Sequence, residues 1–434
     1  MKLLIRDKFH IRTYGCAYNN IDSQIMRDVL RRENLFESSL EDADFIIINT
    51  CAVKGVTENK ILSYLKKIYH RFYDKKVIIT GCLPQISKNS YKKVVKAIPS
   101  FSAIIDVNCI NQIRSILNRI KNGEKNLLLR SKCKIDKSAS FLNYSDDTKT
   151  AIIPISEGCL GSCTYCCVRR SRGNLFTYNT NNILNQIKYQ LSQNKKEIFL
   201  TAQDCSSYNF KGINLIELVH DILSIDKKFY IRIGMINPQF YINTHKKFVE
   251  LFQKEKLYKF LHIPIQSGSD EILQVMNRNY KIELLKESIK YLRKSVPNLT
   301  IATDIICGFP GETRTHFNET IEFIRWLKPE ILNISKFSPR PNTPAKKMKQ
   351  VRSELIKERT TELNKIYNEF ALEKTLKWLK WRGEVLIVKK LKKNQYFGKN
   401  IYYKSIFVDG GKEGEFVNVE IDRIDGRKLI ARII

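Results

Sequence analysis

The chain has 434 residues, 43% of them apolar, so it can bury large cores and is long enough for two to four domains. Its formal net charge of +31 favours a polyanionic partner, above all nucleic acid. No apolar run is long enough to span a bilayer and no signal peptide is present, so we expect a cytoplasmic protein without a membrane partner.

The first segment alternates strands and helices, and its three clearest strands each run into a cysteine. These strands are KFHIRTYGC, ADFIIINTC and KKVIITGC, with helical spacing at residues 20–33 and 57–69. Fully apolar strands between helices predict a parallel sheet that is covered on both faces. We assign residues 1–130 to this α/β domain and the polar stretch 131–149 to a linker.

A second series of strands and helices begins at residue 150. Its six strand candidates are AIIPIS, EIFLTAQ, FYIRIGMIN, FLHIPIQ, TIATDIICGFP and ILNISKFSP. Repeated strand–helix units over residues 150–370 predict a partial (β/α)6 barrel. Residues 371–434 carry 15 Lys and Arg against 8 Asp and Glu. Four short strands in this last part (GEVLIVKKL, YYKSIFVD, GEFVNVEI and KLIARII) predict a small all-β barrel.

Three cysteines lie on one short loop, EGCLGSCTYCCVRRSRGN, directly after the first barrel strand. Cys159, Cys163 and Cys166 have the spacing C-x3-C-x2-C, and the 11 cysteines of a chain without a secretory signal favour metal or redox chemistry. Three thiolates can bind three irons of a cubane cluster and leave the fourth iron open to a small molecule. Zinc would need a fourth close ligand, for which the loop offers only Cys167. Cys167 forms an alternative pair with Cys163 or is an inert neighbour, and we favour the inert neighbour.

Cys16, Cys51 and Cys82, which come earlier in the chain, form a further candidate triplet, with about one strand–helix unit between successive members. Each follows a predicted strand, so all three are expected at the carboxyl edge of one parallel sheet, where open α/β sheets bind ligands. They either converge on one metal site or are three unrelated buried cysteines. The repeated strand-end position favours the metal site, which would again have an open iron.

The loop resembles the signature of the radical S-adenosylmethionine superfamily, C-x3-C-x-aromatic-C, with Tyr165 in the aromatic place beside the cofactor. TYGCAYNNIDSQIM, NTCAVKGVTENK and GCLPQ resemble the N-terminal domain of the methylthiotransferases, which join it to a radical barrel and a C-terminal TRAM barrel. The resemblance covers essentially the whole chain. It implies two [4Fe-4S] clusters and two S-adenosylmethionine molecules. One molecule methylates sulfur at the auxiliary cluster, and the other yields the 5′-deoxyadenosyl radical that abstracts hydrogen.

Six segments are most similar to the archaeal and eukaryotic branch that acts on N6-threonylcarbamoyladenosine in tRNA. They are EGCLGSCTYCCVRRSRGN, IFLTAQDCSSY, RIGMINP, LHIPIQSGSD, IATDIICGFPGET and FSPRPNTPAKKM. This similarity implies methylthiolation at C2 of that adenosine in ANN-decoding tRNA, with an electron donor and a sulfur source as further partners. Eukaryotic members carry a C-terminal membrane anchor, so the end at Ile434 favours a soluble enzyme of the prokaryotic type. The alternatives are the same chemistry on a ribosomal-protein aspartate, and a non-enzymatic iron–sulfur electron carrier with an RNA-binding tail.

Residues at the ends of the barrel strands are candidates for binding S-adenosylmethionine, because barrel strand ends face the active site. Gln203 and Asp204 end the second strand, and Asp204 either contacts the cofactor's amino group or caps a helix. Arg232 binds the methionine carboxylate or forms a structural ion pair. Gln266 and Ser267 end the fourth strand and are expected to line the pocket.

In CGFPGET, Gly308 and Gly311 are expected to allow a close backbone approach near adenine. Arg169, Arg170 and Arg172 are candidates for holding the tRNA backbone, although at least one is expected to be an ordinary solvated residue.

Two departures from the family pattern are Cys167 and Cys205, which either affect cluster assembly or simply pack. In the last domain, Tyr402, Tyr403, Phe397 and Phe407 are expected mostly in the core, while its lysines contact phosphates.

Overall fold

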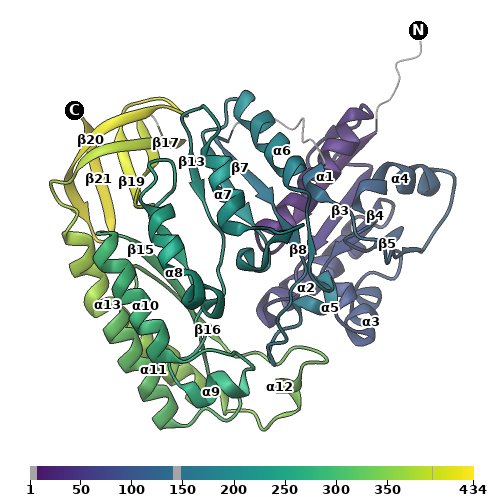
Figure 1. Cartoon of the computed structure of the whole chain (residues 1–434). Coiled ribbons are helices and arrows are strands. Elements are labelled where there is room, and N and C mark those ends of the chain that lie inside the picture. The colour runs from purple at the N-terminus through teal and green to yellow at the C-terminus, as the bar shows by residue number, and fades with distance from the viewer. Residues whose placement is uncertain (1–6, 140–147, 393) are drawn as a thin grey trace. The chain divides into compact units, whose positions relative to one another are not determined.

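The computed structural model describes residues 7–139, 148–392 and 394–434 (Figure 1). The chain divides into two units. Unit 1 contains residues 156–179 and 338–346 together with the N-terminal segment through residue 145, and unit 2 contains the remainder. Residues 140–147, which belong to the predicted linker, lie outside the described residues.

Unit 1 is built on a six-stranded sheet in the order β2-β1-β3-β4-β5-β6, and every pairing is parallel. All six residues of β3 are buried, as expected for a strand covered on both faces. Ile46 and Ile48 pack with Ile61 and Val94 of α2 and α3, and α1 packs against α4. The elements are β1 (Lys8–Thr13), α1 (Ala17–Arg32), β2 (Phe36–Glu37), β3 (Phe45–Thr50), α2 (Gly55–Arg71), β4 (Lys76–Gly81), η1 (Leu83–Gln85), α3 (Lys88–Ala97), β5 (Ala103–Ile105), η2 (Ile110–Gln112), α4 (Ile113–Lys121) and β6 (Leu127–Leu129).

Four short elements complete unit 1. A two-stranded antiparallel ribbon brackets the loop that carries the C-x3-C-x2-C motif. The elements are η3 (Lys137–Ala139), β8 (Ser156–Glu157), α5 (Val168–Arg172) and β9 (Phe176–Thr177).

Unit 2 contains all six strands predicted for the partial barrel. They form two parallel three-stranded sheets, β13-β10-β7 and β14-β15-β16, and a parallel bridge joins Ile231 of β13 to Leu257, just before β14. The strands are β7 (Thr150–Pro154), β10 (Glu197–Thr201), β13 (Tyr230–Arg232), β14 (Phe260–His262), β15 (Thr300–Cys307) and β16 (Ile331–Lys336). The elements between them are α6 (Thr180–Ser192), η4 (Cys205–Ser207), β11 (Asn209–Phe210), β12 (Ile213–Asn214), α7 (Leu215–Leu223), α8 (Pro238–Phe252), α9 (Asp270–Val275), α10 (Ile282–Ser295) and α11 (Arg314–Leu327).

The C-terminal part of unit 2 is a closed five-stranded barrel, yellow in Figure 1, with an interior of aliphatic side chains. The sequence predicted four of its strands and missed β18, whose QYFGKN has a glycine in its middle. That glycine is required by packing, since a Cβ on Gly398 would lie 2.5 Å from Val385 Cγ1. The elements are α13 (Ser353–Leu376), β17 (Arg382–Lys392), β18 (Gln395–Asn400), β19 (Ser405–Asp409), β20 (Phe416–Asp425) and β21 (Lys428–Ile433), whereas α12 (Pro344–Lys347) lies at the end of segment 338–346 of unit 1.

The aromatic residues of this barrel contact its surroundings more than its interior. The Tyr403 ring lies 4.5 Å from the Phe260 ring of β14, and the Tyr402 ring lies 5.4 Å from that of Trp378. Phe397 and Phe407 pack on each other and are half-exposed. The expected core role therefore applies to the two tyrosines, which pack where the barrel meets other elements of unit 2. Across the described part of the chain, every helix is too short or too polar to cross a membrane.

Candidate functional site

The first cysteine triplet in chain order, Cys16, Cys51 and Cys82, lies at the carboxyl ends of three neighbouring strands, and we call it the strand-end triplet. Cys16 follows β1, Cys51 follows β3 and Cys82 follows β4, and these strands are adjacent and parallel. Gly15 has a φ of 119°, and a Cβ on it would lie 2.9 Å from the Cys51 Cβ. Glycine therefore allows the turn that carries Cys16 to approach Cys51. The structure brings the three residues together, and their role as metal ligands stays a prediction.

Asn19, a buried residue in the first turns of α1, connects this triplet. Its Oδ1 accepts hydrogen bonds from Cys16 Sγ at 3.7 Å and Cys82 Sγ at 4.0 Å. The same oxygen accepts from Arg172 Nη2 at 3.0 Å, and Asn19 Nδ2 donates to the Thr50 carbonyl oxygen at 2.9 Å. A single side chain thus positions two thiols and the end of β3.

The chemistry of the three thiols fits an iron–sulfur cluster. Burial raises the pKa of Cys51 to about 11, and the nearby thiols of Cys82 and Cys16 add to this effect. A cysteine that binds metal must be a thiolate. Burial disfavours the thiolate form of Cys51, so the bound metal would have to stabilise it. Within residues 7–139, 148–392 and 394–434, no group of three or more His, Cys, Asp or Glu has the spacing of a single-ion site. A cluster differs from a single ion because each thiolate binds its own iron.

The second triplet, Cys159, Cys163 and Cys166, is positioned by hydrogen bonds within its own loop, and we call it the loop triplet. The amide of Gly161 donates to Cys159 Sγ at 3.2 Å, and the amide of Val168 donates to Cys166 Sγ at 3.4 Å. The amide of Cys166 also donates to the Cys163 carbonyl oxygen at 3.0 Å, which closes the turn between these two cysteines. Amide donors aimed at sulfur favour thiolates and tune the potential of a bound cluster.

Cys167 turns away from this loop and packs beside the first triplet. It is buried, its Sγ donates to the Ala52 carbonyl oxygen at 3.4 Å, and it belongs to the same apolar cluster as Cys51 and Cys82. Both triplets therefore lie within unit 1, and the residue after Cys166 contacts the residue after Cys51. Cys167 therefore lies beside the strand-end cysteines and not beside Cys163, and its inert role stays a prediction.

Four buried charges tie these parts of unit 1 together. Lys137 Nζ lies 2.7 Å from Asp22 Oδ1 and 3.0 Å from Glu157 Oε1. Arg172 lies 2.7 Å from each of the same two carboxylates. Two cations and two anions balance, as buried charges require. We call these four residues the buried charge quartet.

The quartet bears on two expectations from the sequence, the tRNA-binding role of Arg172 and the linker that includes Lys137. Arg172 is 3% exposed and fully engaged, so the expectation that it holds tRNA is wrong, whereas Arg169 and Arg170 are exposed. Lys137 lies in the segment predicted as a linker, yet it is 2% exposed.

Residues 338–346 complete unit 1 by contacting both triplet regions. Arg340 Nη2 donates to Glu58 Oε2 at 2.7 Å, and the Ala345 amide donates to the Thr164 carbonyl oxygen at 3.0 Å. Although burial acts to raise it, the pKa of Glu58 is lowered by its bonds to Arg340 and Lys93. The segment thus joins α2 to the loop of the second triplet.

In unit 2, Arg232 ends β13 inside a cage of aromatic rings. Its guanidinium carbon lies 5.0 Å from the Phe199 ring centroid, 4.7 Å from that of Phe260 and 5.0 Å from that of Tyr403. Its Nε is buried without a hydrogen-bond partner, and Arg232 forms no salt bridge among the described residues. The structure therefore does not show the ion pair that was the alternative role for this residue.

The other residues expected near the cofactor have local roles that the structure makes visible. Asp204 Oδ1 accepts from the Ser206 amide at 3.0 Å and caps η4, as its alternative role predicted. Burial raises the pKa of Asp204, and the bonds from Ser206 oppose this shift. Gln203 lies beside it and is half-buried. Cys205 is fully buried and packs against Gly234, where a Cβ would lie 2.7 Å from its Sγ.

Gln266 and Ser267 were expected to end the fourth strand, but β14 ends at His262 and both residues lie in the turn that follows it. Gln266 has a φ of 80°, and its backbone bonds to Asp304 and Ile306 hold this uncommon conformation. The Ser267 hydroxyl is buried and accepts from the Ser269 amide at 3.2 Å.

The close approach expected at Gly308 is present, but the neighbour is helix α13. A Cβ on Gly308 would lie 2.3 Å from Ile356 Cγ1, whereas nothing lies within 4 Å of the position at Gly311. Tyr165 lies in unit 1 on the loop of the second triplet and is half-buried. Contact of these residues with a cofactor stays a prediction.

Comparison with known proteins decides the family. Residues 8–105 match the Uncharacterized protein family UPF0004, residues 153–324 the Radical SAM superfamily and residues 383–434 the TRAM domain. A probable threonylcarbamoyladenosine tRNA methylthiotransferase of Pyrococcus abyssi is 36% identical over 433 residues, which cover 98% of this chain and 99% of that protein. The chain belongs to the threonylcarbamoyladenosine tRNA methylthiotransferase family.

A human relative agrees with this assignment, and a solved structure shares the fold. The threonylcarbamoyladenosine tRNA methylthiotransferase of Homo sapiens is 33% identical over 373 residues, covering 84% of this chain and 63% of the human protein. The solved radical S-adenosylmethionine methyltransferase TsrM of Kitasatospora setae has a TM-score of 0.58 at 10% identity, over 78% of this chain and 74% of that chain. The latter likeness shows the fold alone.

Sequence reasoning missed several polar residues in this methylthiotransferase. His262 Nε2 lies 2.8 Å from Asp304 Oδ2, and His262 points to the same side of β14 as Phe260. The available signal was a polar residue within each of the apolar strands FLHIPIQ and TIATDIIC. The contacts of Asn19 and of the buried charge quartet gave no such local signal, because their partners lie far away in the chain.

Proposed function

We propose that this chain is a radical S-adenosylmethionine enzyme that methylthiolates C2 of N6-threonylcarbamoyladenosine next to the anticodon of tRNA, forming 2-methylthio-N6-threonylcarbamoyladenosine. The observation that carries the proposal is the 36% identity over nearly the full length of a relative named for this activity. The matched Radical SAM and TRAM domains support an iron–sulfur cluster, S-adenosylmethionine and a tRNA partner. We place the enzyme in the cytoplasm, with an electron donor and a sulfur source as further partners.

Two [4Fe-4S] clusters would be held within unit 1. Cys159, Cys163 and Cys166 would hold the one that binds S-adenosylmethionine, and the strand-end triplet Cys16, Cys51 and Cys82 would hold the auxiliary one. When bound, the clusters supply the electron that cleaves S-adenosylmethionine and the iron at which sulfur is held. The protein supplies amide N–H donors to sulfur at the loop triplet, and at the strand-end triplet Asn19 Nδ2 donates to the Thr50 carbonyl oxygen and so holds the end of β3.

In unit 2, we assign Arg232 to binding the carboxylate of S-adenosylmethionine. A half-buried guanidinium whose Nε is buried and which has no carboxylate partner favours an anionic ligand, since charge-assisted hydrogen bonds satisfy both groups. The rings of Phe199 and Phe260 fix its position. Gln266 would contribute to the same cofactor site through the strained turn after β14.

Mass analysis of tRNA nucleosides from a deletion strain tests the reaction. We expect the methylthio form to disappear and N6-threonylcarbamoyladenosine to accumulate, and the wild-type gene to restore the methylthio form. Persistence of the methylthio nucleoside in the deletion strain would contradict the proposal.

A further inference from the structure

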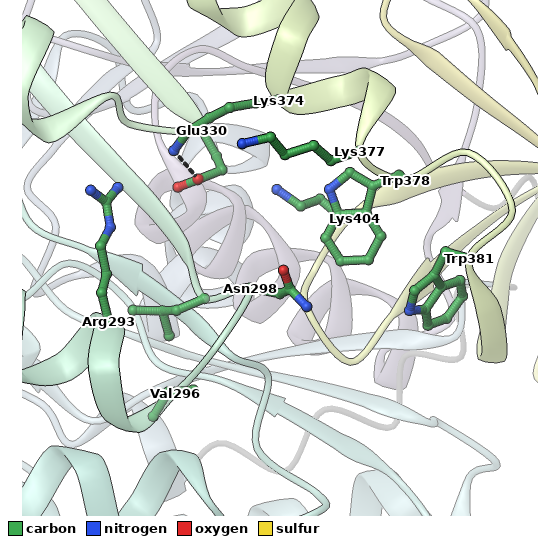
Figure 2. Close-up of a pocket in the computed structure, with 10 residues that line it drawn as sticks. Arg293, Val296, Asn298, Glu330, Lys374, Lys377, Trp378, Trp381 and Lys404 are labelled. Atoms are coloured by element: carbon green, nitrogen blue, oxygen red, sulfur yellow. Dashed lines mark hydrogen bonds and ion pairs between the residues drawn. The ribbon is translucent and has the colours of Figure 1, made fainter.

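A cavity of about 290 Å³ in unit 2 combines basic and aromatic side chains outside the sites described above (Figure 2). We call it the basic–aromatic pocket, and its characteristic residues are Arg293, Lys374, Lys377, Lys404, Trp378 and Trp381. They come from the end of α10, the end of α13 with the turn that follows, and the loop between β18 and β19. The volume corresponds to roughly ten waters at ~30 Å³ each, more than a single small ion needs.

Positive charge is in excess in this pocket. Four cationic side chains line it, and Glu330 is the one carboxylate in its lining. Glu330 is already engaged, because Oε1 pairs with Lys374 and Oε2 accepts from the Ile301 amide at 2.8 Å. Lys377 has a partner on its own helix end, Glu373, at 3.4 Å.

Lys404 is the pocket cation that an anionic ligand would stabilise most. Its Nζ has no hydrogen-bond or ion-pair partner among the described residues and lies 5.3 Å from the Trp378 ring centroid. Burial lowers the pKa of Lys404 to about 8, Glu330 opposes this shift and Lys374 adds to it. An anion in the pocket would stabilise the charged form and raise this pKa again.

The aromatic side of the pocket is suited to a flat ring. Figure 2 shows the ammonium groups turned toward the side where Glu330 and Arg293 lie, with the two indoles on the opposite side. Trp378 is buried and packs against Trp381 at 5.8 Å between centroids. Trp381 itself is half-buried, so part of its ring stays accessible.

We propose that the basic–aromatic pocket binds one nucleotide of RNA, with a backbone phosphate among the cations and a base against Trp381. A ligand that carries a negative group beside a flat ring matches the separation of cations and indoles, and this pairing is the usual way in which proteins hold unpaired nucleotides. A second cavity of about 200 Å³ shares Glu330, Lys374, Trp378 and Lys404 with this pocket and adds Arg427. Arg427 offers a site for the next phosphate of the RNA backbone. The RNA source rests on the proposed function, and the nucleotide would belong to tRNA outside the reacting base.

Tryptophan fluorescence tests this site directly, because two of the three tryptophans of the chain line it. The full-length Trp326→Phe variant leaves only the pocket tryptophans and would be titrated with a five-residue oligoadenylate and with inorganic phosphate. We expect saturable quenching by the oligonucleotide at concentrations where phosphate has no effect. Equal affinity for inorganic phosphate would overturn the nucleotide assignment and leave a simple anion site.

Charge variants add a second readout. Lys404→Gln and Lys377→Gln should each weaken oligonucleotide binding about fivefold and reduce the salt slope of log K by about 0.7. Lys365→Gln is the matched control, since Lys365 is an exposed residue of α13 outside the pocket. Lys377 is also largely exposed, so its variant keeps the test valid if Lys404→Gln or a Trp381 variant fails to fold.

Two results would sink the proposal: no quenching while tRNA still binds the protein, or equal weakening by Lys365→Gln and Lys377→Gln. The assay needs neither a cluster nor S-adenosylmethionine. A negative binding result would therefore not contradict the proposed reaction. Likewise, a failure of the nucleoside analysis to support the reaction would not change the meaning of the binding result.

Discussion

The two cysteine triplets of unit 1 differ in where their supporting atoms come from. Cys159, Cys163 and Cys166 share one loop, and the amides that donate to the sulfurs of Cys159 and Cys166 belong to the same segment. The strand-end triplet comes from β1, β3 and β4, and its supporting oxygen belongs to Asn19, which in turn is held by Arg172. A local motif thus builds one site, while the other depends on the completed sheet and on residues from elsewhere in unit 1.

The strongest test of the comparison removes the loop triplet. Replacing Cys159, Cys163 and Cys166 by Ala should reduce 5′-deoxyadenosine formation below detection and remove about half of the bound iron, because each cluster needs its three thiolates. Anaerobic reconstitution followed by iron analysis and product chromatography measures both. Residual formation of 5′-deoxyadenosine would contradict the assignment of this loop.

The converse variant separates the two sites. Replacing Cys16, Cys51 and Cys82 by Ala should also remove about half of the bound iron but keep 5′-deoxyadenosine formation, because the loop supplies its own ligands. The same two measurements apply. Full retention of iron would mean that the strand-end triplet binds no metal.

A smaller effect is expected from the buried charge quartet. Arg172→Met leaves Asp22 and Glu157 with one cation between them, which should lower the free energy of unfolding by about 3–5 kcal/mol. Urea unfolding measures this loss. Arg169→Met is the matched control on the same helix, since Arg169 is exposed, and a similar loss in both variants would contradict the role of the quartet.

The mildest test concerns Asn19. Asn19→Ala leaves the carbonyl oxygens of Tyr14 and Thr50 without their Nδ2 donor, at a cost of about 1–3 kcal/mol, and the loosened strand ends should speed iron loss from the strand-end triplet alone. Chelator-dependent iron release measures the rate in a protein without the loop triplet. Asn20→Ala, at an exposed neighbouring position, should leave the rate unchanged.

The sequence predicted those features that depend on local pattern. Apolar runs located β1, β3 and β4, and strand–helix alternation located all six barrel strands. Strand β18 was missed because its glycine and polar residues hide a packing requirement set by Val385. The boundaries at residues 130, 149 and 370 stay predictions.

Site features that depend on distant partners were not accessible from sequence. Arg172 looks like one more basic residue in VRRSR, yet its ion pairs with Asp22 and Glu157 bury it. Gly308 was expected to approach a cofactor, but its missing side chain makes room for Ile356 of α13. In both cases tertiary contacts set the role of the residue, and no pattern of neighbours along the chain encodes them.

The buried charge quartet also has a consequence for synthesis on the ribosome. Asp22 emerges early, but its partners Lys137 and Arg172 follow much later, and residues 338–346 come later still. Until then, the nascent sheet exposes an unpaired carboxylate next to three free thiols. Asp22 therefore stays unpaired until Lys137 and Arg172 have been synthesised, well after β1, β3 and β4, and the three thiols are open to oxidation during that interval.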